Sequence, residues 1–409
     1  MSPIEQHAPW LTGDAAAALL QELAGAEATV AAVAAMRKRL TDDAPADAPQ
    51  AAGRAAALFE LVELRSRAAR KFTRAAGMYF TRKALAQATD EWVARYKARR
   101  FAGCSRVVDL CCGAGGDLIG LAGAATEAAG VDADPVLAAM AERNAAVYGF
   151  SARVSRQSLG ADDPPDADAW HADPDRRPAG RRTSQPDRHE PPLEVLAAWR
   201  RSVGDMAVKF APAARLPDEW LAETEAEWIS RGGECRQLVV WAGRLASAPG
   251  RRRATRLFGG PNSPAAEPAT LVGTAGLPTP TADRLGDWIV DPDPAVLAAD
   301  LRGSLAERHG LAGALGGSAY LTGDRDPQDP LAPAFRVLEV LPLKPKLLSG
   351  WLAERGVGRL EIKCRGVDVR PESLRQKLRL RGSEELTLLV LSGGAGRPQV
   401  VAAERPGHN

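Results

Sequence analysis

Two carboxylates in this chain each lie at the end of a short apolar run, and a glycine-rich turn separates them. Asp109 follows the first run, Asp132 ends the second, and Gly113 and Gly115 lie in the turn. Glycine lets a ligand approach the backbone closely. One acid can receive an α-amino group, and the other can accept hydrogen bonds from both hydroxyls of a ribose. The pattern therefore favours a cationic nucleoside, S-adenosylmethionine, as the ligand.

A dinucleotide such as NAD fits the same segment less well. Its fingerprint, G-x-G-x-x-G, lets a pyrophosphate lie on a helix N-terminus. Counted from Gly113, Leu118 occupies the position of the third glycine, and Asp117 falls in the first helical turn, where it would repel a phosphate. S-adenosylmethionine has no phosphate, so neither feature opposes its binding. The structural alternative is an ordinary βαβ turn with two solvated acids.

Three motifs resemble those of class I methyltransferases. Residues 109–117 (DLCCGAGGD), 131–135 (VDADP) and 144–149 (NAAVYG) are similar to D-x-x-C-G-x-G-G-(N/D), D-x-D-P and N-A-x-x-Y-G of the trimethylguanosine synthase group. Over most of its length the chain more closely resembles bacterial methyltransferases with a THUMP-like C-terminal domain. The further matching segments are 85–89 (LAQAT), 173–177 (DPDRR), 208–212 (VKFAP), 227–230 (EWIS), 360–367 (LEIKCRGV) and Leu378.

This resemblance implies a Rossmann-like sheet of seven strands with the last one reversed. It also implies S-adenosylmethionine as cofactor and, because THUMP modules bind RNA, an RNA partner. A third cofactor contact is implied after the third strand, where Asp162 and Asp163 are the candidates; the structural alternative is a solvated pair in a loop. The predicted cofactor-binding residues are Asp109, Cys111, Gly113, Gly115, Asp132, Ala133 and Asp162.

The segment DPDRR follows the fourth predicted strand and is predicted to face the substrate. It resembles (N/D/S)-P-P-(Y/F/W) of amino methyltransferases, which accepts hydrogen bonds from the target amine and stacks an aromatic ring on the base. Asp173 and Pro174 match, whereas Asp175 replaces the second proline and Arg176 replaces the aromatic residue. Arginine can stack on a base or hold a phosphate. We therefore predict Asp173 and Arg176 as catalytic, and Pro174 and Arg177 as substrate-binding; a surface turn with weak ion pairing is the structural alternative.

Some RNA uracil methyltransferases resemble the same segment with D-P-P-R, and they add a nucleophilic cysteine in a later S-C-N-P-type loop. The chain has no such loop, since Cys235 precedes a predicted strand and Cys364 lies in the C-terminal part. Covalent catalysis is therefore not expected. Cys111 and Cys112 are expected to pack as small hydrophobic side chains.

Basic residues gather between positions 65 and 100. Lys71 and Arg74 flank Phe72, and basic groups interleaved with aromatic rings can hold phosphates and stack bases. We therefore predict both basic residues as substrate-binding, with a solvated basic helix face as the alternative. A second basic cluster, from Lys363 to Arg381, is nearly balanced by nearby acids and is a weaker signal.

The composition is that of an ordinary globular protein. The 409 residues suffice for two or three domains, and the net charge of +2 gives no global field that would attract nucleic acid. The five cysteines and five histidines form no C-x-x-C pair or Cys/His cluster, so neither a metal site nor a disulfide framework is expected. We find no signal peptide and no membrane-spanning apolar run, so no membrane partner is expected and the cytoplasm is the expected location.

The expected fold class is α/β, in three parts. These are an N-terminal helical region at 1–100, a methyltransferase domain at 101–265, and a C-terminal α/β, THUMP-like domain at 285–409. In the first part, helices are expected at 12–35, 51–76 and 81–100. In the second, strands are expected at 107–110, 128–132, 152–156, 168–172 and 205–210, with helices at 118–125 and 135–148, a closing hairpin at 237–241 and 254–257, and a linker at 259–284. In the third, strands are expected at 288–290, 319–321, 335–341, 359–363, 385–391 and 399–403, with helices at 295–309, 344–355 and 371–378.

The leading hypothesis is methylation of a base in tRNA or rRNA. Asp109 and Asp132 would hold the cofactor, Asp173 would orient or deprotonate the nucleophilic nitrogen, and Arg176 or Arg177 would hold the substrate. One alternative is an RNA-binding protein with a catalytically silent methyltransferase fold. Another is a small-molecule or protein methyltransferase in which the terminal domains serve only as lids.

Overall fold

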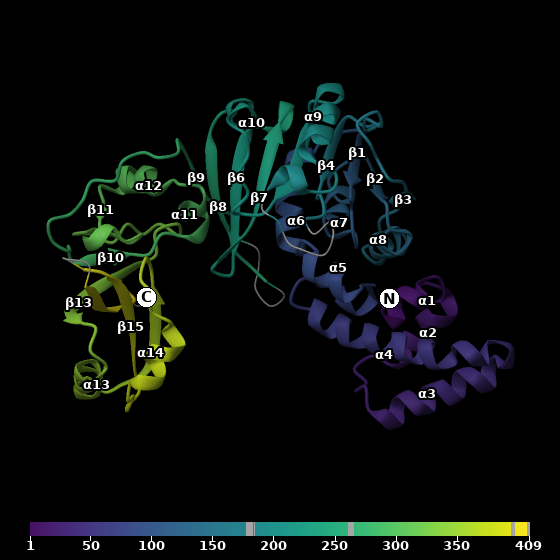
Figure 1. Cartoon of the computed structure of the whole chain (residues 1–409), viewed down its shortest axis with the longest axis horizontal. Helices are drawn as coiled ribbons and strands as arrows, with labels where there is room; N and C mark the ends of the chain where they lie inside the picture. The colour runs from purple at the N-terminus through teal and green to yellow at the C-terminus, as the bar shows by residue number, and fades with distance from the viewer. Residues whose placement is uncertain (177–182, 184, 261–265, 394–396, 407–409) are drawn as a thin grey trace. The chain divides into compact units, whose positions relative to one another are not determined.

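The computed structural model describes residues 1–176, 183, 185–260, 266–393 and 397–406. The chain forms two compact units (Figure 1). The first comprises Met1–Glu225, Gln237–Pro249 and Leu257–Glu267, and the second comprises Ala226–Arg236, Gly250–Arg256 and Pro268–Asn409. Both units contain helices and strands, which confirms the α/β fold class. The three-part division at residues 100, 265 and 285 stays a prediction.

The sheet of the first unit is mainly parallel. It contains β1 (Arg106–Leu110), β2 (Glu127–Asp132), β3 (Arg153–Arg156), β4 (Ala169–Ala172), β5 (Met206–Phe210) and most of β7 (Glu234–Ala242). Their order is β3-β2-β1-β4-β5-β7; the first five run parallel, and β7 runs antiparallel to β5. All residues of β4 and β5 are buried, as expected for central strands covered on both faces. The five predicted parallel strands and the reversed strand are confirmed.

The predicted hairpin of 237–241 with 254–257 is wrong. Residues 254–257 belong to β8 (Arg252–Leu257), which pairs antiparallel with β9 (Ala269–Gly273), a strand inside the predicted linker. The sequence pattern also does not predict β6 (Glu225–Arg231). Glu225 and Glu227 interrupt its apolar pattern, yet both are fully buried, with hydrogen bonds from Arg100 and Thr255 respectively.

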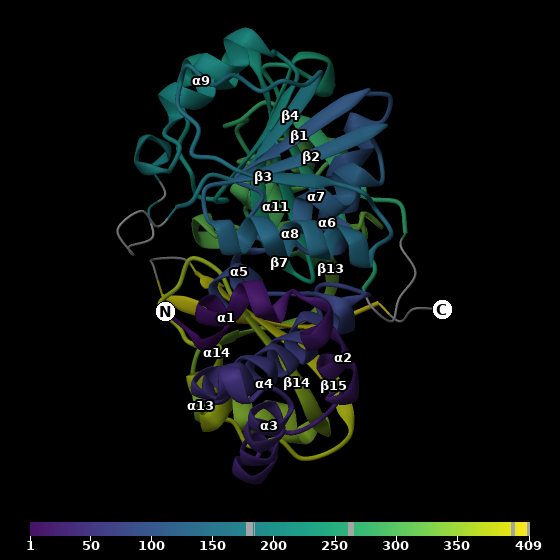
Figure 2. The ribbon, with the colours of Figure 1, turned by 90° about the vertical axis from the view of Figure 1, so that its right-hand side faces the viewer.

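Five helices of the first unit accompany its sheet. They are α6 (Glu91–Ala98), α7 (Gly116–Ala122), α8 (Pro135–Val147), α9 (Leu193–Ser202) and α10 (Asp218–Glu223). Helices α7 and α8 pack directly on the strands β1–β3, as Figure 2 shows, and α7 also packs against α6. A Cβ at Gly120 of α7 would lie 2.7 Å from the carbonyl oxygen of Ala94, so the close approach of α6 and α7 requires glycine there.

The N-terminal region is helical, as predicted. It contains α1 (Pro3–Leu11), α2 (Asp14–Glu22), α3 (Val30–Asp43), α4 (Ala51–Ala68) and α5 (Arg82–Gln87), and the first strand among the described residues begins at Arg106. Two predicted helices are broken in two. Gly25 takes a left-handed backbone (φ 78°) between α2 and α3, and Asp90 caps α6 after a break that follows α5.

The second unit contains β6, β8 and β9 together with a seven-stranded sheet. The strands of that sheet are β10 (Trp288–Val290), β11 (Ala312–Gly313), β12 (Leu321–Gly323), β13 (Ala334–Pro342), β14 (Val357–Cys364), β15 (Glu384–Ser392) and β16 (Pro398–Glu404). Their order is β11-β12-β10-β13-β16-β15-β14. Its helices are α11 (Pro294–Ala298), α12 (Arg302–His309), α13 (Pro345–Glu354) and α14 (Pro371–Lys377), so the helix predicted at 295–309 is divided. No helix in the described parts of the chain is long and apolar enough to span a bilayer.

Candidate functional site

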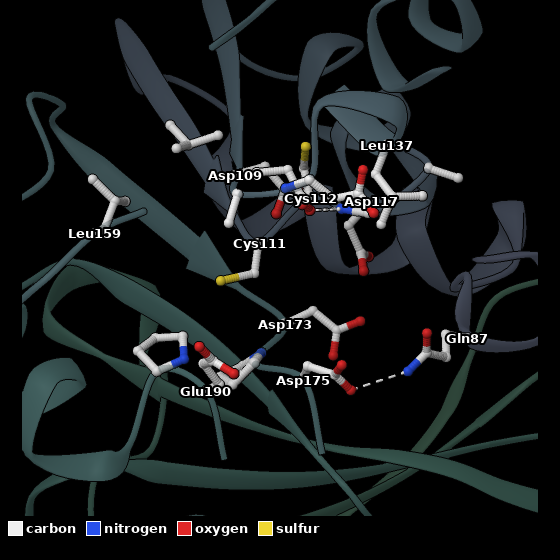
Figure 3. Close-up of a pocket in the computed structure, with 18 of the residues that line it drawn as sticks. Gln87, Asp109, Cys111, Cys112, Asp117, Leu137, Leu159, Asp173, Asp175 and Glu190 are labelled. Carbon is white, nitrogen blue, oxygen red and sulfur yellow. Dashed lines mark hydrogen bonds between the residues drawn. The ribbon is translucent and has the colours of Figure 1, made fainter. Parts of the chain in front are cut away.

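A cavity of about 460 Å³ opens in the first unit at the carboxyl ends of β1, β2 and β4 (Figure 3). Open parallel sheets bind ligands at this edge, and the volume suits a small molecule. Eight of the predicted site residues line it: Asp109, Cys111, Gly113, Asp132, Ala133, Asp173, Pro174 and Arg176. The fold therefore brings the predicted cofactor turn and the predicted substrate segment to one cavity.

The turn after β1 is shaped by left-handed backbone. Cys111, Gly113 and Gly115 all have positive φ, at 58°, 56° and 78°. Only glycine adopts this conformation without cost, and a Cβ at Gly115 would also lie 3.1 Å from the Cα of Ala141. Gly115 therefore lets α8 pack against the turn, whereas Gly113 and Cys111 face the cavity.

Asp132, at the end of β2, is held by two backbone amides. The Gly113 N–H donates to Oδ2 over 2.8 Å, and the Asp134 N–H donates to Oδ1 over 2.9 Å. Burial raises the pKa of Asp132, although both hydrogen bonds oppose the shift. A carboxylate has about four acceptor positions, so Asp132 retains capacity for the two hydroxyls of a ribose.

Asp109 lies in a cluster of buried charged groups beneath the cavity. His171 Nδ1 lies 2.7 Å from its Oδ1, Lys97 Nζ lies 3.1 Å from His171 Nε2, and Lys97 Nζ lies 2.6 Å from Asp117 Oδ1. Burial raises the pKa of Asp109, with His171 opposing the shift. Burial acts upward on Asp117 too, but Lys97, His171 and Lys209 outweigh it and lower the pKa of that carboxyl.

The cluster continues to the substrate side of the cavity. Thr89 donates to Asp117 Oδ2 over 2.7 Å, and Lys209 donates to Thr89 over 2.9 Å and to Asp173 Oδ2 over 2.5 Å. Burial would lower the pKa of Lys209, but the carboxylates of Asp173 and Asp117 outweigh it and raise that pKa. An unbroken series of hydrogen bonds and ion pairs therefore connects the two ends of the cavity.

These residues fit S-adenosylmethionine. Asp109 Oδ2 is buried and has no hydrogen-bond partner among the described residues. The α-ammonium of the cofactor would satisfy that oxygen and pair with the carboxylate. Among the described residues, no group of His, Cys, Asp and Glu side chains is arranged to hold a metal ion.

The substrate side is more acidic than the sequence suggests. Asp173, Asp175 and Glu190 lie across the cavity from Asp109 (Figure 3). The Asp175 carboxylate accepts hydrogen bonds from Lys83 over 3.0 Å and Gln87 over 3.3 Å. Asp175 also exchanges two backbone hydrogen bonds with Glu190, which brings residues 190–192 to the cavity wall. Arg177 lies outside the described residues.

Three other predicted residues lie elsewhere. Asp162 lines a neighbouring cavity of about 520 Å³, and the structure does not bring it together with Asp109. Lys71 donates to the carbonyl oxygens of Leu85 and Ala88, both over 2.8 Å, at the end of α5. Arg74 stacks on Tyr148 and donates to the carbonyl oxygen of Val147. All three assignments stay predictions, and these contacts give Lys71 and Arg74 a structural role.

The NAAVYG motif holds the N-terminal region against the cofactor turn. Asn144 is fully buried; it accepts from the Tyr79 N–H over 2.7 Å and donates to the carbonyl oxygens of Tyr79 and Ala114 over 2.9 Å each. Tyr148 donates over 2.8 Å to Glu91, which is buried as well. The motif therefore supports the site without lining it.

Sequence reasoning misses three buried residues of the site. His171, Lys97 and Lys209 are each less than a tenth exposed and lie on β4, α6 and β5. Signals were present for two of them: His171 precedes Asp173 by two residues in an apolar strand, and Lys209 interrupts the apolar run of β5. For Lys97 the sequence offers no such signal, because it lies among other basic residues in a predicted helix.

In the second unit, Lys363 pairs with the buried Asp291 over 3.0 Å, which gives the LEIKCRGV motif a structural role.

Comparisons with known proteins identify methyltransferases as relatives of this chain. Residues 104–159 match the family described as RNA cap guanine-N2 methyltransferase, and residues 332–405 match the THUMP domain-like family. Proteins of two Mycobacterium tuberculosis strains, CDC 1551 and H37Rv, are each described as an uncharacterized S-adenosylmethionine-dependent methyltransferase. Each is 38% identical over 336 residues, which cover 79% of this chain and 87% of the relative.

A solved structure extends the likeness to nearly the whole chain. A protein from Porphyromonas gingivalis W83, whose crystal structure is described as that of a methyltransferase, aligns with a TM-score of 0.70 at 21% identity, covering 87% of this chain and 92% of its own. At 21% sequence identity, this similarity establishes a shared fold. The extent of the mycobacterial match decides the identity: the chain belongs to the family of S-adenosylmethionine-dependent methyltransferases with a THUMP-like C-terminal domain.

Proposed function

We propose that this enzyme methylates a nitrogen atom of an RNA base. The observation that carries the proposal is the position of Asp173 and Pro174, which line the same cavity as the cofactor acids Asp109 and Asp132. A carboxylate there can accept a hydrogen bond from a base nitrogen and aim its lone pair at the cofactor. The pair also matches the first two residues of the amino-methyltransferase segment.

The chain's own residues divide the work between binding and orientation. S-adenosylmethionine supplies an activated methyl group, so in-line alignment of the nucleophile is the main requirement. Asp132 would accept the ribose hydroxyls, and Asp109 would accept the ammonium. Lys209 holds Asp173 by a hydrogen bond of 2.5 Å, and Asp173 would receive the proton of the nitrogen or orient it.

Two matches support RNA as the substrate. The family matched by residues 104–159 is described as acting on the guanine of an RNA cap, and the family matched by residues 332–405 is THUMP domain-like. The departures from the amino-methyltransferase segment bear on how the base is held. Asp175 is tied to Lys83 and Gln87, so it would not contact the base freely, and Arg176 at the cavity wall can stack on a base.

The test is a labelling experiment. Purified protein is incubated with S-adenosylmethionine carrying a labelled methyl group and with total RNA from cells that lack the gene. We expect nuclease-sensitive label, and mass spectrometry of the nucleosides then identifies the modified base. Asp173→Asn should abolish the label, whereas Asp218→Asn, an exposed acid on α10, should leave it unchanged.

The same experiment separates the alternatives. Label in protein or in a small molecule would overturn the RNA assignment and favour the other methyltransferase classes. RNA binding without any label, in protein that binds the cofactor, would identify a catalytically silent fold.

A further inference from the structure

The hydrogen-bond donors beneath the cavity determine where one proton lies. A lysine ammonium has three N–H groups to donate and no acceptor. Lys97 Nζ lies 2.6 Å from Asp117 Oδ1 and 3.1 Å from His171 Nε2, so Nε2 must accept and carries no proton. The proton of the imidazole is then on Nδ1, which lies 2.7 Å from Asp109 Oδ1 and donates to it.

Because this proton is donated to Oδ1, the two carboxylate oxygens of Asp109 differ in their hydrogen bonding. Oδ1 is occupied by His171, whereas Oδ2 is buried without a hydrogen-bond partner among the described residues, and Asp109 lines the cavity. His171 and Asp109 are each 1% exposed, so water competes little for either group. The carboxylate is therefore held by one oxygen, and the other keeps its capacity to accept a hydrogen bond.

We propose that His171 and Lys97 are positioning residues for the cofactor, which act by fixing Asp109 so that Oδ2 receives the α-ammonium of S-adenosylmethionine. Lys97 selects the tautomer of His171, and His171 orients the carboxylate. The other charged groups facing this part of the cluster are Asp117, whose Oδ2 lies 3.8 Å from His171 Nε2, and, beyond Thr89, Lys209 with Asp173. This role concerns cofactor binding and does not depend on the nature of the substrate.

A matched pair of substitutions tests the proposal. In His171→Asn the side-chain amide nitrogen takes the position of Nδ1 and can still donate to Asp109. In His171→Gln it takes the position of Nε2 and cannot. Affinity is measured by calorimetry for S-adenosylmethionine and for 5′-methylthioadenosine, which retains the nucleoside but lacks the amino-acid part. The second ligand reports on the Asp132 half of the cavity alone.

We expect His171→Gln to weaken binding of S-adenosylmethionine by about tenfold or more, the loss of one charge-assisted contact. Binding of 5′-methylthioadenosine should stay unchanged, and His171→Asn should keep most of the affinity for both ligands. A purely structural role of His171 predicts instead that both ligands lose affinity together. That result, or equal affinities of the Asn and Gln variants for S-adenosylmethionine, would overturn the proposal.

Substitution of Lys97 distinguishes a positioning role from a purely electrostatic effect on cofactor binding. Lys97→Met removes a positive charge, so electrostatics alone predicts tighter binding of the cationic cofactor, whereas loss of the tautomer lock predicts weaker binding. Because Lys97→Met removes the ion pair of Asp117, the double variant Lys97→Met/Asp117→Asn, which leaves the net buried charge unchanged, provides a second form of the test. Asp218→Asn, an exposed acid on α10 outside the cavity, is the control and should bind both ligands normally. Unchanged or tighter binding of S-adenosylmethionine in the double variant would refute the role of Lys97.

Discussion

Replacing Asp109 by asparagine should make the ligand-free protein more stable and the cofactor-binding site worse. The carboxylate is 1% exposed, and its Oδ2 has no hydrogen-bond partner among the described residues. Burial raises its pKa, so the ionised form is disfavoured in the folded chain. The amide introduced by Asp109→Asn would keep the bond from His171 through its oxygen and would remove the negative charge of the carboxylate.

The expected changes in folding stability and in cofactor affinity can be estimated from the same contacts. A buried charge without a full set of partners costs more than a neutral amide in the same place. Asp109→Asn removes that charge, although the N–H₂ group that replaces Oδ2 also lacks a partner, and should gain about 1–3 kcal/mol of stability near neutral pH. Since the amide oxygen of the variant faces His171, its N–H₂ group faces the cavity, and a donor replaces the acceptor of the cofactor's ammonium. We expect S-adenosylmethionine binding to lose about 2–4 kcal/mol, roughly 30- to 900-fold in Kd.

The assay combines denaturant unfolding without ligand and calorimetric titration with S-adenosylmethionine. Because the folded pKa of Asp109 is raised, the wild-type protein loses stability as pH rises through that pKa, and the stability gap between variant and wild type should close on acidification. A variant that is less stable than the wild type at neutral pH, or that binds the cofactor equally well, would refute this reasoning.

Three further predictions concern the residues of the cavity and the packing of helices. Asp173→Asn should reduce RNA labelling by about a hundredfold or more while S-adenosylmethionine affinity stays within about threefold; parallel losses of both would instead make Asp173 a cofactor ligand. Since burial raises the pKa of Asp132, cofactor affinity should fall earlier on acidification than an ordinary carboxyl would allow, and a flat titration from neutral to mildly acidic pH would contradict this. Gly120→Ala should destabilise the fold by about 1–3 kcal/mol because its Cβ would lie 2.7 Å from a backbone oxygen of α6. Gly350→Ala, in a helix with open space at that position, should stabilise it by about 0.5–1 kcal/mol, so equal changes in chemical denaturation would refute the packing argument.

The parallel strands and their terminal acids could be predicted from the sequence because the signals are local. Short apolar runs alternating with helical segments indicate βαβ units, and parallel strands of one sheet end at the same edge. Asp109, Asp132 and Asp173 therefore had to lie near one another once the alternation was recognised. The cofactor followed from residue types at that edge.

The failures come from charged residues that the fold buries. Glu225 and Glu227 interrupt the apolar pattern of β6, although both side chains are fully buried. In each case the partner that makes burial tolerable lies far away in the sequence or on another element. Composition and periodicity carry no information about such partners.

The sequence by itself determined the fold class, the class of cofactor, and the edge of the sheet at which Asp109, Asp132 and Asp173 meet. These features depend on strand periodicity and turn residues, which are local properties of the sequence. Only the tertiary structure decided that His171, Lys97 and Lys209 join those acids in one buried network. Lys97 and His171 are separated by 74 positions and lie on α6 and β4. Contacts over such separations depend on how helices and strands pack, which no local pattern specifies.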